Sequence, residues 1–272
     1  MSFLELGSHR IHYQVHNPSN LSTRPLLLLH GLGSSGEDWL LQEEAFTQHY
    51  PVVTVDLRGH GHSSTGPGWP AIADYAEDAV KLLEGLDLGP AHVLGLSLGG
   101  MVALQLALDW PDRTSSLTIV NACARMRVGA RGSIRALGRI LLLALGRMDW
   151  LGAWIAAGLF PDPAQKAWRQ AAAQRIAGNP RGSYLKALSA VARFDSVSRL
   201  GELHIPTFIV AGDRDTTIGL ESKQLLADQI PGARMARIPE SGHATPYDAS
   251  ARFNPLVLGF LGEVERQHAN QA

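Results

Sequence analysis

The sequence predicts an α/β fold, in which a mostly parallel sheet is built from strands joined by helices. Short apolar runs rich in leucine and β-branched residues alternate with longer stretches of helical spacing. Several of these runs are apolar throughout, as strands are when helices cover both faces of a parallel sheet. Residues 122–200 break the alternation, because they contain several helical stretches and no clear strand. We therefore expect this segment to be a helical insertion between two core strands.

The strands are expected in order along the chain. Residues 10–16 alternate apolar and polar side chains, which predicts an edge strand. The other expected strands are residues 25–30, 52–56, 91–96, 117–121, 207–211 and 233–238.

Three helices of the expected core have clear limits. Residues 71–86 carry apolar side chains at helical spacing. Residues 98–109 are apolar almost all round, which predicts a buried helix, and Trp110-Pro111 ends it. A final helix is expected over residues 249–267.

The composition excludes several classes of protein. The chain has 272 residues, of which 45% are hydrophobic, and a formal net charge of -1, so it can bury a large core and carries no basic excess for nucleic acid. The single cysteine, Cys123, excludes a disulfide framework and a Cys-based zinc site. The start of the chain has no secretory pattern, and the apolar run at 140–145 is too short to span a membrane. We expect a cytoplasmic protein with no stable membrane insertion, whose oligomeric state the sequence leaves open.

Charge is distributed unevenly. Residues 121–200 contain 13 Lys and Arg residues against three acids, a net charge of +10, whereas the rest of the chain sums to −11. Arg127, Arg131, Arg135 and Arg139 recur every four residues and so share one helical face. This face is interpreted as a solvated surface or a surface that docks on the acidic core; the alternatives are attraction of an anionic substrate and attraction to a membrane surface.

A nucleophile elbow is the strongest local motif. Residues 95–100 read GLSLGG, between an expected strand and an expected helix. The pattern G-x-S-x-G at such a turn holds the serine in a strained conformation with its hydroxyl above the sheet. Ser97 is therefore the candidate nucleophile; the alternative is an ordinary glycine-rich turn with a capping serine.

A second glycine-rich loop, HGLG at residues 30–33, follows an expected strand. Its backbone N–H groups can point into the site, so the amides of Leu32 and Leu98 are expected to form an oxyanion hole. The His30 side chain is expected to make a structural hydrogen bond.

A serine nucleophile needs a base and an acid that orients it. His243 follows the last expected strand, and the loop GDRD at 212–215 supplies Asp213 and Asp215 after the preceding one. Both loops lie at the carboxyl ends of strands, where α/β sites are built. His60 and His62 lie in another loop of this kind and are interpreted as packing residues.

These motifs together resemble the α/β-hydrolase superfamily. The carriers of the resemblance are GLSLGG at 95–100, HGLG at 30–33, DLRGHGHS at 56–63 and SGH at 241–243. The resemblance implies a mostly parallel eight-stranded sheet, a core of residues 1–121 and 201–272, and a helical cap at 122–200. It also implies Ser97 as nucleophile, His243 as base and Asp215 as acid, with Asp56 and Arg58 in a structural loop. Thr216-Thr217-Ile218-Gly219 departs from the family, which often has a proline shortly after the acid.

The resemblance implies a serine carboxylic-ester hydrolase, similar to carboxylesterases and enol-lactonases, that forms an acyl-enzyme from a small ester or lactone. No metal or organic cofactor is implied. Serine at position 97 argues against the dehalogenase and epoxide hydrolase branches, which carry aspartate there. The alternatives are an acyltransferase, a cofactor-free perhydrolase or a C–C hydrolase with the same triad, or a non-catalytic ligand-binding protein.

Overall fold

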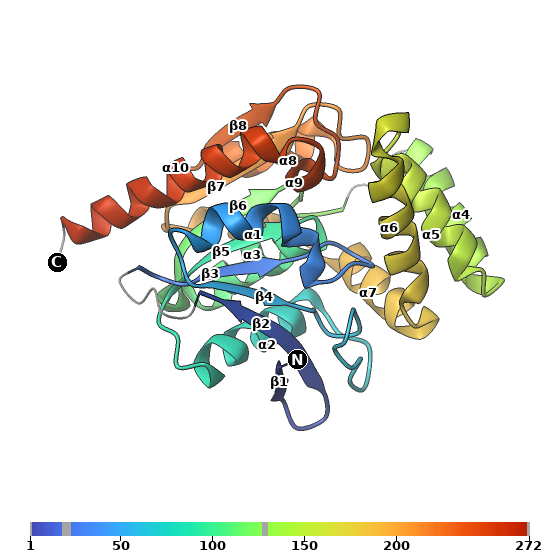
Figure 1. The fold of residues 1–272 in the computed structure, drawn as a ribbon, viewed down its shortest axis with the longest axis horizontal. Coiled ribbons are helices and arrows are strands. Elements are labelled where there is room, and N and C mark those ends of the chain that lie inside the picture. The colour runs from blue at the N-terminus through green and yellow to red at the C-terminus, as the bar shows by residue number, and fades with distance from the viewer. Residues whose placement is uncertain (1, 18–22, 127–129, 271–272) are drawn as a thin grey trace.

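The structure is a computed structural model that describes residues 2–17, 23–126 and 130–270, with the side chains of these residues except 130–136. One eight-stranded sheet forms its centre, with helices on both faces (Figure 1). The strand order is β1-β2-β4-β3-β5-β6-β7-β8, in which β1, β2 and β4 pair antiparallel and all later pairs are parallel. The predicted fold class is therefore confirmed.

The strands of the sheet are short, and the central ones are buried on both faces. They are β1 (Ser2–Glu5), β2 (Arg10–His16), β3 (Leu26–Leu29), β4 (Val52–Val55), β5 (Ala91–Leu96), β6 (Thr114–Val120), β7 (Thr207–Gly212) and β8 (Arg234–Ile238).

The helices fall into two groups along the chain. Those that pack on the sheet are α1 (Leu40–Thr47), α2 (Ile72–Gly85), α3 (Leu98–Asp109), α8 (Leu220–Gln229) and α10 (Ser250–Ala269). Those between β6 and β7 are α4 (Ala130–Ala144), α5 (Met148–Leu159), α6 (Lys166–Gly178) and α7 (Arg181–Arg193). The short helix α9 (Thr245–Asp248) precedes α10, and 3-10 turns lie at Gly36–Trp39, Pro111–Arg113, Pro163–Gln165 and Val197–Glu202.

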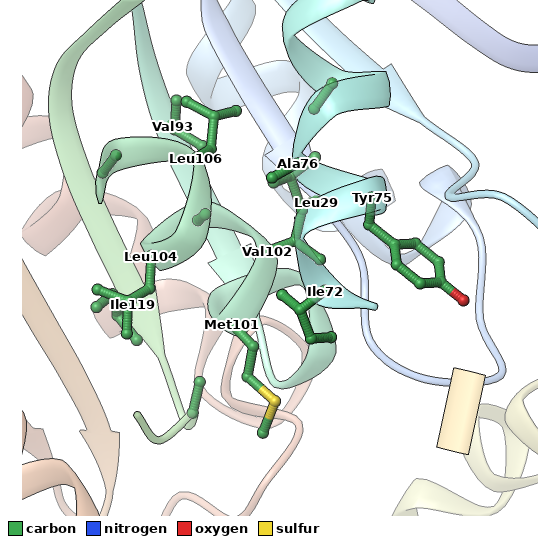
Figure 2. Packing of buried hydrophobic residues seen from close by; sticks show 14 of the residues in the cluster. Leu29, Ile72, Tyr75, Ala76, Val93, Met101, Val102, Leu104, Leu106 and Ile119 are labelled. Atoms are coloured by element: carbon green, nitrogen blue, oxygen red, sulfur yellow. The ribbon is translucent and has the colours of Figure 1, made fainter. Parts of the chain in front are cut away.

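Two apolar cores lie on opposite faces of the sheet. On one face α2 and α3 pack against the central strands; Figure 2 shows Val102 and Leu106 of α3 beside Leu29 and Val93. On the other face the core includes Phe46 of α1 and several side chains of α10. Because side chains of both faces are buried, the central strands are apolar throughout rather than alternating.

The strand order reverses next to β3. The chain runs from β3 to β4 on one side, and then returns to place β5 on the other. Loops at such a reversal diverge and leave a crevice at the carboxyl ends of the strands, where ligands bind in open α/β sheets. Residues 30–33 and Ser97 follow β3 and β5, so the fold brings both predicted motifs to this crevice.

The segment between β6 and β7 forms a helical layer beside the sheet (Figure 1). An isolated β-bridge between Arg125 and Asp195 joins its two ends. A small apolar cluster holds its helices together, with one buried side chain from each: Leu143, Leu151, Ile176 and Tyr184.

The strand at residues 10–16 was predicted to form an edge, and that prediction is wrong. β2 pairs with β4 on one side and with β1 on the other. The β1 strand has only four residues, and it is too short to produce a distinct pattern in the sequence. The predicted final helix, residues 249–267, corresponds to α10, and the short helix α9 precedes it.

Candidate active site

Ser97 occupies a strained turn between β5 and α3. Its backbone has φ 55° and ψ −112°, and positive φ is uncommon for residues other than glycine. The Ser97 carbonyl accepts a hydrogen bond from the N–H of Met101 at 3.1 Å, so the helix begins immediately after the serine. This is the conformation that the sequence predicted for a nucleophile elbow.

Two glycines allow the elbow to form because the backbone passes close to them. A Cβ atom at Gly95 would lie 2.1 Å from the carbonyl oxygen of Gly99. A Cβ atom at Gly99 would lie 2.0 Å from the carbonyl oxygen of Leu29. Any other residue would push α3 away from β3 and β5, so these two positions fix where the Ser97 hydroxyl stands.

The two predicted oxyanion donors belong to residues that line the same cavity as Ser97. Leu98 is the first residue of α3, where a backbone N–H has no acceptor within the helix. Leu32 lies in the loop that follows β3. Both residues line the cavity that Ser97 lines, so their amides can meet a negative oxygen that develops at a bound carbonyl.

The structure pairs His243 with Asp215. Nδ1 of His243 lies 2.9 Å from Oδ2 of Asp215, whose side chain is fully buried. Asp213 is exposed instead. Ser97 and His243 line one cavity, but the hydrogen bonds of the described residues do not include one between them. Hydrogen bonds of this kind are often long in the absence of substrate and shorten in the complex.

The Asp215 carboxylate is held by four hydrogen bonds. Oδ1 accepts from the backbone N–H groups of Thr217 at 2.7 Å and Ile218 at 3.1 Å, and Oδ2 accepts from His243 and from Lys223 at 2.8 Å. Burial by itself raises the pKa of this carboxyl group, but His243 and Lys223 more than offset it and lower the pKa to about 2. Asp215 is therefore ionised at neutral pH, as a group that orients an imidazole must be.

Asn121 joins the loops that carry His243 and Asp215, a role that the sequence did not reveal. Its Nδ2 lies 2.9 Å from the carbonyl of His243 and 2.7 Å from Oγ1 of Thr245. Its Oδ1 accepts a hydrogen bond from the N–H of Gly212 at 2.9 Å. The residue has φ 45°, a conformation that asparagine tolerates better than most residues. An asparagine at the end of a strand was the available signal, but it fits an ordinary turn equally well.

Replacement of Asn121 by alanine should weaken both the fold and the site. The change removes the hydrogen bonds that Asn121 makes to the Gly212 N–H and the His243 carbonyl, so we expect the free energy of unfolding to fall by about 1–3 kcal/mol. Turnover should also fall, because the loop of His243 is no longer tied to the end of β7. Thermal denaturation and ester hydrolysis measure the two effects. Asn254→Ala, on the half-buried face of α10, is the control, and an equal loss of turnover in both variants would contradict the role of Asn121.

A cavity of about 820 Å³ opens over Ser97. Its floor comes from the loops after β3 and β5 and from His243, and its far wall comes from α4–α7. Phe160 and Trp168 in this wall form an aromatic group with Tyr247 of α9, with ring centroids 5.8–6.1 Å apart. The wall is therefore mainly apolar and aromatic, which suits a small organic substrate.

The large apolar residues of the helical segment are divided between the cavity and the surface. Trp154, Leu159, Phe160 and Trp168 line the cavity. Trp150 does not, because its side chain is exposed and stacks against the guanidinium of Arg147, 3.8 Å from the ring centroid.

Two arginines of the helical segment face the cavity. Arg175 is paired with Glu37 at 3.0 Å and Asp38 at 3.1 Å, so its charge is offset. Arg139 also lines the cavity, and the ion pairs of the described residues do not include it. Of the predicted arginine row, Arg127 lies outside the described residues, as do the side chains of Arg131 and Arg135.

His30, His60 and Arg58 lie in the loops that follow β3 and β4, where their contacts are structural. His30 is fully buried, with Nδ1 at 2.7 Å from the carbonyl of Gly31 and Nε2 accepting from the N–H of Leu57 at 2.9 Å. Burial lowers the pKa of His60 to about 3, so this ring is neutral. Arg58 pairs with Asp78 at 2.6 Å. Within the ranges that the structure describes, no group of three or more His, Cys, Asp or Glu side chains is arranged to hold a metal ion.

A family model described as the alpha/beta hydrolase fold matches residues 24–250 of the chain. The chain belongs to the α/β-hydrolase family. The candidate site of this α/β-hydrolase consists of the elbow after β5, the glycine-rich loop after β3 and the histidine after β8. The predicted superfamily is thus confirmed. None of the helices that the structure describes is both long enough and apolar enough to cross a membrane.

Individual α/β-hydrolases resemble this one over nearly its whole length. It is 30% identical over 276 residues to "Putative carbamate hydrolase RutD" of Azorhizobium caulinodans, a match that covers 98% of this chain and all of the relative. A hydrolase from Pseudomonas aeruginosa PA01 superposes with a TM-score of 0.87 at 29% identity, over 96% of this chain and 98% of that chain. The enol-lactonase from Burkholderia xenovorans LB400 gives a TM-score of 0.89 at 21% identity over 96% and 100%, a likeness of fold alone. The family and these relatives support hydrolase activity.

Proposed function

We propose that this hydrolase cleaves a carboxylic ester or lactone through an acyl-enzyme on Ser97. The observation that carries the proposal is the Asp215–His243 hydrogen bond at the wall of the cavity that the strained Ser97 also lines. A nucleophile and a base that line one cavity, with an ionised acid bonded to the base, are the parts that acyl transfer requires.

In the first half of the proposed reaction, the Ser97 oxygen attacks the substrate carbonyl while Nε2 of His243 takes the hydroxyl proton. Asp215 accepts a hydrogen bond from Nδ1, which fixes the ring tautomer and stabilises the imidazolium. The amides of Leu32 and Leu98 donate to the negative oxygen of the tetrahedral intermediate. His243 then returns the proton to the leaving alcohol, and the acyl group stays on Ser97.

In the second half, water takes the place of the alcohol. His243 removes a proton from the water, the hydroxide adds to the acyl carbonyl, and the Ser97 oxygen leaves with the proton that His243 returns. The products are a carboxylic acid and the regenerated serine. The proposal requires neither a metal nor an organic cofactor.

The proposal treats residues 122–200 as a cap on a core of residues 1–121 and 201–272. Its support is the far wall of the cavity, which α4–α7 supply while the core supplies the reacting groups. A cap of this kind selects the substrate by shape, and the aromatic group at Phe160, Trp168 and Tyr247 favours apolar or planar parts of a small molecule.

Carbamate hydrolysis is a second candidate for the same machinery. The full-length relative at 30% identity is named for it. A carbamate carbonyl offers the same electrophilic carbon to Ser97, and its tetrahedral intermediate needs the same oxyanion donors. The difference lies in the acyl group, because hydrolysis of a carbamoyl-enzyme releases carbamic acid rather than a carboxylic acid.

A substrate screen tests the proposal. Purified protein is assayed with p-nitrophenyl esters of different chain lengths, with lactones, thioesters and p-nitrophenyl carbamates. Hydrolysis of esters or lactones, together with covalent labelling of Ser97 by a serine-directed phosphonate, is the expected result. A preference for carbamates would support the second candidate. Transfer to added alcohols in place of hydrolysis would indicate an acyltransferase, and no labelling at Ser97 would overturn the proposal.

Arg139 leads to a prediction about the charge of the substrate. Arg139 lines a cavity with a mainly apolar far wall, so a substrate that carries a carboxylate should gain a charge-assisted hydrogen bond there. We expect Arg139→Gln to lower kcat/KM for a carboxylate-bearing p-nitrophenyl ester by roughly tenfold, and to leave a neutral ester of similar size unchanged. The effect of Arg139 on kcat/KM for the carboxylate-bearing ester should also weaken as salt is added, since charges are screened over about 10 Å at 0.1 M.

The control for this prediction is Lys166→Gln, which removes the same charge at an exposed position outside the cavity lining. If Arg139→Gln and Lys166→Gln affect the anionic ester alike, the cap acts through its overall charge. If neither does, the arginine face is a solvated surface or docks on the core.

A further inference from the structure

Lys223 is a lysine with no exposed surface, on the helix α8. Its Nζ donates a hydrogen bond to Oδ2 of Asp215 at 2.8 Å and approaches the carbonyl of Gly212 at 3.4 Å. Burial of an ammonium group is unfavourable unless the group is paired. The lysine is therefore held in the interior by the same carboxylate that binds His243.

The ammonium and the imidazole share one oxygen atom. Oδ2 of Asp215 lies 2.9 Å from Nδ1 of His243 and 2.8 Å from Nζ of Lys223, while Oδ1 is occupied by two backbone N–H groups. When His243 is neutral, one carboxylate faces one cation. When His243 takes a proton, two cations face that carboxylate and repel each other.

We propose that Lys223 is a positioning residue of the triad, which holds the Asp215 carboxylate against His243 and keeps His243 in its neutral, basic form to lower pH. The inference rests on the proposed function, since it concerns the base of that reaction. The same repulsion makes the imidazolium a stronger acid, which favours return of the proton to the leaving group.

Two other ionisable groups face this cluster from neighbouring elements. Asp248 of α9 accepts hydrogen bonds from the Ser241 hydroxyl and the Gly242 N–H, both at 2.7 Å; burial raises its pKa, and when ionised it favours a charged His243. Cys123, which follows β6, lies near Asp215 and Lys223, but burial raises the pKa of its thiol to about 12 and it is uncharged at neutral pH. Lys223 therefore brings a positive charge to a cluster that also contains the carboxyl groups of Asp215 and Asp248.

The test removes the charge of Lys223 in two ways. Lys223→Met keeps the length of the side chain without a polar end, and Lys223→Gln keeps a hydrogen-bond donor without charge. Two quantities are measured as a function of pH for both variants and for the wild type. They are kcat/KM for a p-nitrophenyl ester and the rate at which a phosphonate labels Ser97. Thermal denaturation reports stability separately, and Lys81→Met, which breaks an exposed ion pair with Glu77, is the control.

We expect the acid side of both profiles to move to higher pH by about one unit in the two Lys223 variants and to stay in place in Lys81→Met. A folded variant that loses stability but keeps the wild-type profile would overturn the inference. Failure of both variants to fold would overturn it too, because the lysine would then serve the fold rather than the triad. A wild type that neither hydrolyses esters nor is labelled at Ser97 would instead reject the proposed function.

Discussion

Replacement of Ser97 by alanine is expected to abolish nearly all hydrolysis, with kcat/KM lower by a factor on the order of 10⁴–10⁶. In the proposed mechanism the hydroxyl oxygen forms the acyl-enzyme, and residues 95–100 contain no other nucleophilic side chain. The backbone conformation of the elbow depends on Gly95 and Gly99, so the fold should be kept. The small activity that remains would come from binding and from the amides of Leu32 and Leu98.

Ser34→Ala is the matched control for this variant. Ser34 also lines the cavity, but its hydroxyl donates to Asp38 and is outside the proposed triad. The measurements are kcat/KM for the best ester, the thermal denaturation midpoint, and phosphonate labelling followed by mass spectrometry. Near-normal turnover by Ser97→Ala, or labelling at a different residue, would reject Ser97 as the nucleophile.

Replacement of Asp215 by asparagine is expected to lower kcat by about 10⁴-fold, because an amide favours the wrong tautomer of His243. The structure adds a second effect. The substitution leaves Lys223 buried without its carboxylate, and breaking a buried ion pair in this way costs about 3–5 kcal/mol of stability. Asp213→Asn, two residues away and exposed, should leave both turnover and stability nearly unchanged.

The dependence of stability on pH should change in the same variant. The pKa of Asp215 is lowered to about 2 in the folded protein, whereas an aspartate in an unfolded chain titrates near 3.9. A group whose pKa is lower in the folded state stabilises the fold above the unfolded value, and this contribution is lost as the pH falls from about 4 towards 2. The melting temperature of Asp215→Asn should therefore vary less over this range than that of the wild type.

A double variant separates the two effects of Asp215. Asp215→Asn together with Lys223→Met removes both charges, so much of the lost stability should return while turnover stays low. If the double variant is no more stable than Asp215→Asn alone, Lys223 is not destabilised by losing its partner. If the loss of turnover is larger in Asp213→Asn than in Asp215→Asn, Asp213 is the acid in solution.

The sequence predicted the parts of the site that depend on neighbours along the chain. The elbow at Ser97 follows from glycines two residues to each side, because only a glycine lets the backbone of α3 come within contact of β3 and β5. The buried helix α3 follows from its apolar residues on every face, and its bounds agree with the prediction. The short edge strand β1 left no such local pattern, which is why β2 was taken for the edge.

Groups far apart in the chain were placed only by the tertiary structure. The loop at 212–215 contains two acids. The family resemblance implied Asp215, and only the structure shows its carboxylate against a histidine 28 residues away. Asn121 and Lys223 gave no distinctive signal, since an asparagine after a strand and a lysine on a short helix are ordinary on a protein surface.

What the sequence by itself determined is therefore the family, the sheet, the elbow and the residue types of a triad, because each is encoded in local spacing and in the order of motifs. The tertiary structure decided which acid meets His243, that Asn121 ties the loops together, and that a buried ammonium shares the acid with the base. These contacts form only when strands and helices distant in the chain pack side by side, and their energies depend on burial, which local sequence does not specify.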